Sequence, residues 1–425
     1  MLNRKYLYIC TELHAEYLLI SDYEETTPSL AELDGKYIKK LKMIMALGHD
    51  QTREFQPLNK FLTTLVNLTS LRCSQVCNND MLKIISKTCP YLEEVYIEMC
   101  TDVDDEGLYH LSGYIPSQET YSNIRDGAKV PVKSGCKRLK TVNCEYTCAG
   151  ARGAAMLLHL CPVLEELLIP PDVNMGDVFT LLHGTNTDRY EEVTTRYALR
   201  VLNNYMELDE DILALIVRTC PGLKDISLRC NGVERKDRNL LANLLGLKTE
   251  VLNVKNCSMS ALLWYLEQRG SDIKSLAIQH LSMAPMSLTF TRSHLQDIIK
   301  ICPKLENFTL KLNNSPIQPD RPYSSFGSNL VYFTSLTHLT LEGLSITHED
   351  LSVLISKCNT LLELHILILN LEMLEDNVLY EFLSSGCLQS LQSLYLHRPL
   401  LTYEGLKRLI RDCPKLHTVG PLSSW

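Results

Sequence analysis

The sequence predicts an α/β solenoid in which each repeated unit contributes one short strand and one helix. Three observations predict this fold class: a recurring phrase, apolar pairs with strand spacing after it, and helix-like stretches between its copies. The phrase is a cysteine, a proline and, three residues after the cysteine, a leucine. Its cysteine recurs at Cys89, Cys161, Cys220, Cys302 and Cys413. Recurrence of this kind is the sequence signature of a repeat architecture.

Alignment of the units on the position of Leu92 gives fourteen units. Seven of the thirteen spacings between neighbouring units are 24 to 26 residues, inside the ~20–29 residues of leucine-rich repeats. The units at Leu199 and Thr249 match least well. The aligned positions, called anchors below, are Ile38, Leu68, Leu92, Leu139, Leu164, Leu199, Leu223, Thr249, Ile273, Leu305, Leu336, Leu361, Leu391 and Leu416.

Each unit is expected to begin with a strand. Apolar residues recur three and five places after the anchor, as in Leu339 and Leu341. Side chains two residues apart share one face of a strand, so both residues of such a pair face inward. Residues two, four and six places after the anchor therefore face the other way.

The second half of most units predicts a helix. Asp209 is placed to cap the helix of Ile212 to Val217, and Thr402 that of Leu406 to Ile410. The cysteine–proline pair then ends each helix, because proline disfavours helical geometry in the residue before it. Strands need ~4.8 Å of spacing and helices ~8–10 Å, so the stack should bend into a ribonuclease-inhibitor-like horseshoe with parallel strands on its concave side.

A resemblance to a known family rests on one unit in particular. The run from Cys100 through Thr101, Asp102 and Gly107 to Leu108, followed later by the cysteine–proline phrase, resembles the cysteine-containing leucine-rich repeat typical of F-box proteins. The resemblance covers roughly residues 35–425. It implies the substrate-recognition subunit of an SCF-type ubiquitin ligase in ubiquitin-dependent protein degradation. Its partners would be a substrate protein, a Skp-type adaptor and a cullin.

The segment before the repeats does not match an F-box module. Residues 1–36 contain no leucine–proline pair, and Pro28 interrupts any long helix there. The stretch from Lys5 to Cys10 favours a strand. We therefore expect residues 1–36 to form a strand that caps the solenoid of residues 37–425, with adaptor contacts made by a module that these residues do not supply. The alternative is a scaffold or inhibitor without a ligase.

Long spacings between anchors predict loop insertions. Their composition, rich in glycine, proline, serine and asparagine, disfavours strands and helices. They are predicted near residues 112–134, 170–196, 281–292 and 313–329. Tolerated surface insertion and a contribution to a binding site both remain open for them.

Composition and charge restrict the function classes. The net charge of −8 and the pI of about 5.9 disfavour nucleic-acid binding, which requires cationic contacts to phosphates. No apolar run approaches the ~18 residues of a membrane span, and the first residues lack the apolar core of a signal peptide. We expect a cytoplasmic protein, with the nucleus as a further compartment, and sixteen reduced, structural cysteines.

No motif predicts an enzyme, a cofactor or a metal. Residues 148–153 have the setting of a dinucleotide loop, but Cys148 replaces its first glycine, so we expect only a tight turn. Two cysteine pairs, Cys73 with Cys77 and Cys144 with Cys148, fall on strands that are not adjacent and predict packing rather than zinc. Four histidines fall on consecutive strands; the first three face the concavity, but neighbours lie ~8 Å apart, too far for one ion, so we expect a solvated surface. The four histidines are His338, His365, His397 and His417.

The concave face carries the predicted binding site. Positions two, four and six after the anchors are basic in the first units, with Lys40, Lys42 and Arg72, and then acidic. A protein partner with a basic segment is the functional interpretation, and a merely solvated face is the alternative. Aromatic residues at these positions would add anchors. The candidate partner-binding residues are Glu94, Tyr96, Glu98, Glu145, Glu166 and Tyr395.

Overall fold

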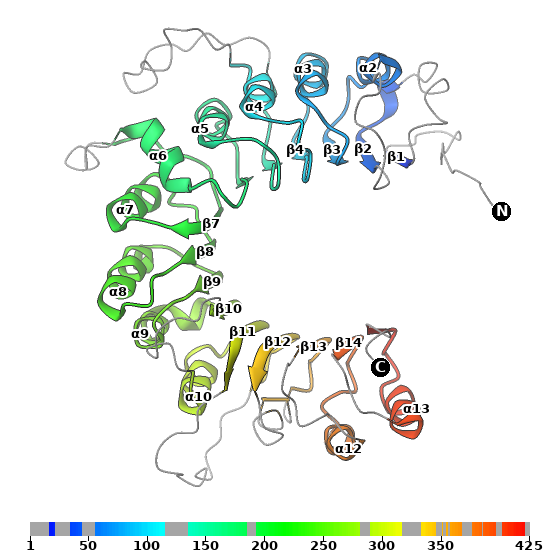
Figure 1. The fold of residues 1–425 in the computed structure, drawn as a ribbon, viewed down its shortest axis with the longest axis vertical. Coiled ribbons are helices and arrows are strands. Elements are labelled where there is room, and N and C mark those ends of the chain that lie inside the picture. Colours follow the sequence, from blue (N-terminus) through cyan, green and yellow to red (C-terminus); the bar gives the residue numbers. More distant parts are fainter. Residues whose placement is uncertain are drawn as a thin grey trace, which may run out of the picture. The chain divides into compact units, whose positions relative to one another are not determined.

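The structure, a computed structural model, describes most of the repeats. The described residues are 17–21, 35–44, 56–114, 135–184, 193–280, 290–316, 333–345, 351, 354–355, 358–367, 376–384, 386–396 and 402–420. The chain divides into two compact units, Met1–Leu223 (unit 1) and Lys224–Trp425 (unit 2). Each unit is a succession of strand and helix (Figure 1).

Unit 1 contains a parallel sheet whose strands follow one another in chain order. Strand β1 lies at its edge and pairs with β2 over five residues, so the segment 1–36 does contribute a strand to the first repeat. This strand lies at Tyr17–Ser21; the stretch Lys5–Cys10 lies outside the described residues. The strands of the sheet are β1 (Tyr17–Ser21), β2 (Lys40–Ile44), β3 (Ser70–Ser74), β4 (Glu94–Tyr96), β5 (Thr141–Asn143) and β6 (Glu166–Leu168), and β7 (Val201–Glu207) follows them in the chain.

The helices of unit 1 pack in sequence order on one face of this sheet (Figure 1). The strand residues that face these helices are buried. In β4 and the residue after it, Val95 and Ile97 are fully buried, whereas the alternate residues Glu94 and Tyr96 are half-buried. This alternation is the one predicted from the anchors. The helices are α2 (Gln56–Leu62), α3 (Asn79–Thr88), α4 (Asp105–Ser112), α5 (Ala151–Leu160), α6 (Met175–His183) and α7 (Glu210–Thr219), after a 3-10 turn η2 (Gly35–Tyr37).

Unit 2 repeats the same plan, which confirms the predicted α/β repeat fold class in both units. Its strands pair in parallel in chain order: β8 (Asp225–Arg229), β9 (Val251–Lys255), β10 (Ser275–His280), β11 (Asn307–Pro316), β12 (His338–Ser345), β13 (Glu363–Leu367), β14 (Ser393–Leu396) and β15 (Thr418–Gly420). Its helices are α8 (Glu234–Ala242), α9 (Met259–Arg269), α10 (Arg292–Ile301), α12 (Asp376–Ser384) and α13 (Tyr403–Asp412), with 3-10 turns η5 (Asn243–Gly246) and η6 (Gly270–Asp272).

The predicted helix ends are confirmed. The side chain of Asp209 accepts a hydrogen bond from the backbone of Asp211, and that of Thr402 from the backbone of Gly405. The cysteine of the recurring phrase is the C-cap residue directly after each helix, and its backbone N–H still donates to a carbonyl of that helix. The C-caps of α3, α5, α7, α10 and α13 are Cys89, Cys161, Cys220, Cys302 and Cys413.

In unit 1, the buried cysteines Cys89, Cys136 and Cys161 form a row between repeats. The thiol of Cys136 lies 3.8 Å from the carbonyl oxygen of Cys89, and the thiol of Cys161 lies 3.8 Å from that of Cys136. A weak S–H donor is thereby satisfied inside the core, where an unpaired polar group would be costly.

The predicted loop at 170–196 is wrong over nine residues. Helix α6 occupies Met175–His183. Asn174 caps it, and Val178 and Phe179 are fully buried. The glycine and polar residues from residue 184 onward led to the prediction of a loop for the whole segment. The apolar residues before them form a helix instead, because the free energy gained by their burial outweighs the local preference for a loop. At the other predicted insertions, β11 extends through 313–316 and α10 begins at Arg292; residues 115–134, 281–289 and 317–332 lie outside the described residues.

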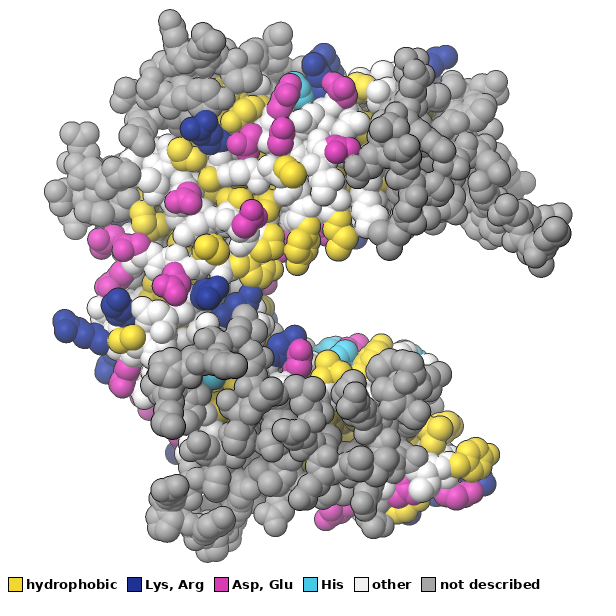
Figure 2. Space-filling model, viewed as in Figure 1, with side chains coloured by type: hydrophobic (Ala, Val, Ile, Leu, Met, Phe, Trp, Pro, Cys, Tyr) yellow, Lys and Arg dark blue, Asp and Glu magenta, His cyan; other side chains and the backbone are white. Residues whose placement is uncertain are grey.

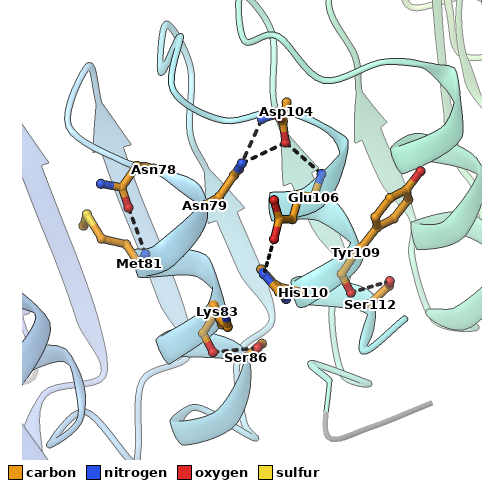
Figure 3. Close-up of polar contacts among 10 residues, drawn as sticks. All are labelled: Asn78, Asn79, Met81, Lys83, Ser86, Asp104, Glu106, Tyr109, His110 and Ser112. Atoms are coloured by element: carbon orange, nitrogen blue, oxygen red, sulfur yellow. Dashed lines mark hydrogen bonds and ion pairs between the residues drawn. The ribbon is translucent and has the colours of Figure 1, made fainter. Parts of the chain in front are cut away.

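Side chains near the helix starts join one repeat to the next. At the start of α3, the amide of Asn79 donates to a carboxylate oxygen of Asp104 at 2.8 Å, and the backbone N–H of Asp104 donates back at 3.2 Å (Figure 3). Asp104 also caps α4 through the N–H of Glu106. One cluster therefore fixes two helix starts at once.

The same arrangement, which we call the repeat bracket, recurs further along the chain. At the start of α4, one carboxylate oxygen of Asp105 accepts hydrogen bonds from the backbone of Gly150 at 2.7 Å and of Gly153 at 2.9 Å. In unit 2, Asp376 accepts from the backbone N–H of Thr402 at 2.9 Å. Orphan N–H groups of one helix are thus satisfied by the preceding repeat.

The bracket at Asp105 leads to a prediction at Gly153. Alanine in a helix is usually more stable than glycine by up to ~1 kcal/mol. Here an added Cβ would lie 2.6 Å from a carboxylate oxygen of Asp105 and 2.9 Å from Leu108. We expect Gly153→Ala to lower the free energy of unfolding by ~1–2 kcal/mol instead.

Urea unfolding followed by circular dichroism measures this effect. Gly246→Ala is the matched control, because nothing lies within 4 Å of its added Cβ. An unchanged or raised midpoint for Gly153→Ala would show that the bracket tolerates a methyl group.

Candidate functional site

The exposed face of the unit 1 sheet places the predicted residues on neighbouring strands. Glu94 of β4 is in register with Thr141 of β5, which is in register with Glu166 of β6. In the next row, Tyr96 is in register with Asn143. We call Glu94, Tyr96, Glu98, Glu145 and Glu166 the acidic face.

Hydroxyl groups beside the carboxylates orient the first row. The Ser70 hydroxyl donates to Glu94 Oε2 at 2.9 Å, and the Thr141 hydroxyl lies 3.4 Å from Glu166 Oε2. Each carboxylate keeps further acceptor positions, because an ionised carboxylate offers about four lone pairs. Both side chains remain partly exposed and available to a partner.

Tyr96 lies where the basic and acidic ends of the face meet. The guanidinium of Arg72 stacks 4.0 Å from the centre of its ring, a cation–π contact. Burial, followed by the negative charge of Glu94, raises the pKa of Tyr96; Arg72 opposes this and Glu166 adds to it. The phenol therefore stays neutral at physiological pH and presents a hydroxyl group beside the carboxylates.

Asn143 and Tyr205 organise the second group of carboxylates. The Asn143 amide is buried and donates to Glu98 Oε1 at 2.7 Å, while its oxygen accepts from the backbone of Glu145 at 3.0 Å. The Tyr205 hydroxyl donates to Glu145 Oε1 at 3.0 Å. Burial is the main cause that raises the pKa of Tyr205, so this hydroxyl remains a donor.

The structure brings five of the six predicted residues together in unit 1. The sixth, Tyr395, lies in unit 2, where its ring packs at a tilt against that of His365, with 4.2 Å between centroids. Sequence reasoning missed Tyr205, which also contributes to the site, because the unit anchored at Leu199 is irregular. It missed Asn143 as well, because an uncharged residue four places after an anchor carries no charge signal.

A group of possible metal ligands lies elsewhere, in unit 2. One ligand atom each from Cys230, Asp237 and Cys257 lies within 4.8 Å of the others. The carboxylate of Asp237 accepts from the backbone N–H groups of Asn231 and Ser258, the same role that Asp105 has in unit 1. A hydrogen bond with Cys230, followed by burial, raises the pKa of Cys257, which opposes the thiolate that a metal needs. We assign the group to packing between repeats.

Several of the other residues weighed for metals or nucleotides contact neighbouring repeats or neighbouring side chains. The N–H groups of Gly150 and Gly153 are directed at Asp105, so the turn at 148–153 is part of a repeat bracket. His338 and His365 lie 3.8 and 3.9 Å from the carboxylate of Glu363. His397 lies outside the described residues.

None of the helices in the described part of the chain is both long and apolar enough to span a bilayer.

No family model matches the chain. One chain in a crystal structure of the Rad7 and Elc1 complex in yeast is similar to it, with a TM-score of 0.51 and 15% sequence identity. The similarity covers 95% of this chain and 85% of the other. At this identity the comparison concerns the fold alone, and it supports the strand–helix repeat architecture described for each unit.

Proposed function

We propose that this protein is a protein-binding leucine-rich-repeat solenoid whose acidic face captures a partner with a basic segment. The observation that carries the proposal is the set of carboxylates held in place by neighbouring donors, above all Glu98 by Asn143 and Glu145 by Tyr205. Binding groups that are fixed before the encounter lose less conformational entropy on association.

The charge pattern supports a cationic partner. Lysine or arginine side chains would donate charge-assisted hydrogen bonds to the free lone pairs of Glu94 and Glu166. These carboxylates are half-buried, so they lose only part of their hydration on binding. Such charges contribute mainly to the association rate and to specificity.

The finer proposal is a role as the substrate-recognition subunit of an SCF-type ubiquitin ligase. The repeats resemble those of F-box proteins, and a chain of similar fold occurs in the Rad7 and Elc1 complex. In this role the repeats hold the substrate, and a Skp-type adaptor and a cullin complete the complex. A scaffold or inhibitor would use the same face without them.

Affinity purification of the whole chain, read by mass spectrometry, tests both levels of the proposal. We expect the triple variant Glu94→Lys, Glu98→Lys and Glu166→Lys to keep its circular dichroism and to lose at least ~10-fold in partner affinity. The loss should lie mostly in the association rate, and wild-type binding should weaken with salt.

The matched control applies the same change in net charge to exposed acidic residues away from the acidic face: Asp102→Lys, Glu267→Lys and Glu381→Lys. Equal binding by both triple variants would identify the acidic face as a bystander surface. Recovery of an adaptor and a cullin with the wild-type chain supports the ligase role; their absence beside a basic partner favours the scaffold or inhibitor.

A further inference from the structure

Large apolar side chains lie exposed directly beside the acidic face. Seven residues after the anchors Leu68, Leu92 and Leu139 lie Gln75, Met99 and Tyr146, which we call the turn row. Met99 is 51% exposed and Tyr146 is 57% exposed. Figure 2 shows hydrophobic side chains, tyrosines included, gathered along the lower edge of unit 1 in that view. Exposed apolar patches on a soluble protein often mark interaction sites.

The backbone at these positions is in the left-handed region. The φ angles are 64° at Gln75, 59° at Met99 and 58° at Tyr146. Glycine or asparagine adopts this geometry with least strain, and Asn256 does so at the same position of a unit 2 repeat, with a φ of 54°. Methionine and tyrosine therefore stand at a backbone position that disfavours them. Local strain of this kind is concentrated at functional sites.

The turn row and the acidic face form one continuous surface. Glu98 and Glu145 immediately precede Met99 and Tyr146 in the chain. The backbone N–H of Met99 donates to the carbonyl of Glu145 at 3.0 Å, which ties the two turns together. The Gln75 amide lies 3.8 Å from the sulfur of Met99 and links the preceding turn.

We infer that the turn row anchors a large apolar side chain of the partner, while Glu98 and Glu145 bind lysine or arginine residues that flank it. The occupant is thus a polypeptide segment that combines basic residues with at least one large apolar residue. This inference rests on the proposed function and narrows it. The negative charge argues for a cationic occupant. Methionine adapts to differently shaped apolar groups, and tyrosine offers a rigid flat anchor.

Selection of binders from a phage-displayed library of random twelve-residue peptides tests the inference on the full chain. We expect wild-type protein to enrich peptides in which lysine or arginine flanks leucine, methionine or an aromatic residue. The double variant Met99→Gly and Tyr146→Gly should bind the selected peptides at least ~10-fold more weakly. Glycine adopts positive φ angles without strain, so the melting temperature of this double variant should not fall below that of the wild type.

The control variant is Tyr91→Ala with Val163→Ala, which removes exposed apolar side chains at the turns that precede β4 and β6. It should bind the selected peptides as the wild type does. Enrichment of basic residues alone, or equal weakening by the control, would overturn the inference and leave the acidic face as the binding site. Enrichment of neither residue class would overturn the inference and the proposed function together.

Discussion

Removal of residues 1–36 lowers the melting temperature by roughly 5–10 °C or makes the protein aggregate. The reason is the pairing of β1 with β2, which extends in register from Tyr17 with Lys40 to Ser21 with Ile44. Without β1, the backbone N–H and C=O groups on that side of β2 lose their partners. An unpaired strand edge invites pairing with another chain.

The truncation should also destabilise the apolar core of the first repeat. Leu41 and Met43 of β2 are almost completely buried in the core behind the sheet. Terminal repeats of a solenoid need a cap, because each repeat is stabilised chiefly by its neighbours. Loss of β1 therefore loosens β2 together with the apolar residues that it places in the core.

Thermal melting and light scattering on the truncated chain provide the measurement. A point variant separates strand pairing from chain length: Ile20→Pro removes a backbone donor on the side of β1 that faces β2, and Ile20→Val keeps the donor. We expect the proline variant to follow the truncation and the valine variant to follow the wild type. A truncated chain that stays soluble and melts unchanged would refute the cap.

The five helix-ending cysteines react with a thiol reagent at least ~100-fold more slowly than Cys148 in the native protein. All five are buried, and Cys148 is exposed. Burial raises the pKa of Cys89, Cys161 and Cys413 to about 11, and that of Cys220 and Cys302 to about 12. A pKa raised by two units leaves ~100-fold less of the reactive thiolate at pH 8, and steric protection adds to this.

Labelling at pH 8, followed by mass spectrometry of the peptides, measures each site. All proteins in this experiment carry Cys10→Ser, because Cys10 lies outside the described residues. Cys148→Ser should then remove the fast reaction, and denaturant should make all remaining thiols react quickly. Fast labelling of the five without denaturant would show that these thiols are open to solvent.

Periodicity allowed much of this fold to be predicted. The anchors, the alternation along the strands and the caps at Asp209 and Thr402 follow from local pattern, because a repeat brings each pattern into the same environment many times. The acidic face could be predicted for the same reason. Its residues lie at even places after the anchors, and the strand fixes which way they point.

The remaining features depend on contacts between repeats or on backbone angles. Helix α6 was missed because its burial, rather than its composition, stabilises it. The turn row depends on positive φ angles, and nothing in Met99 or Tyr146 as residue types predicts that geometry. The repeat bracket at Asp105 needs two glycines forty-five or more residues away, across an insertion, so no local pattern reveals it.

The repeat bracket also bears on how the chain gains and loses its structure. Because Asp105 of one helix holds the first amides of the next, α5 loses hydrogen-bond partners as soon as α4 frays. Each bracket is thus a nearest-neighbour coupling in an array whose folding can spread from one repeat to the next. Repeats joined by a bracket should therefore open together, and they should share one level of protection against hydrogen exchange.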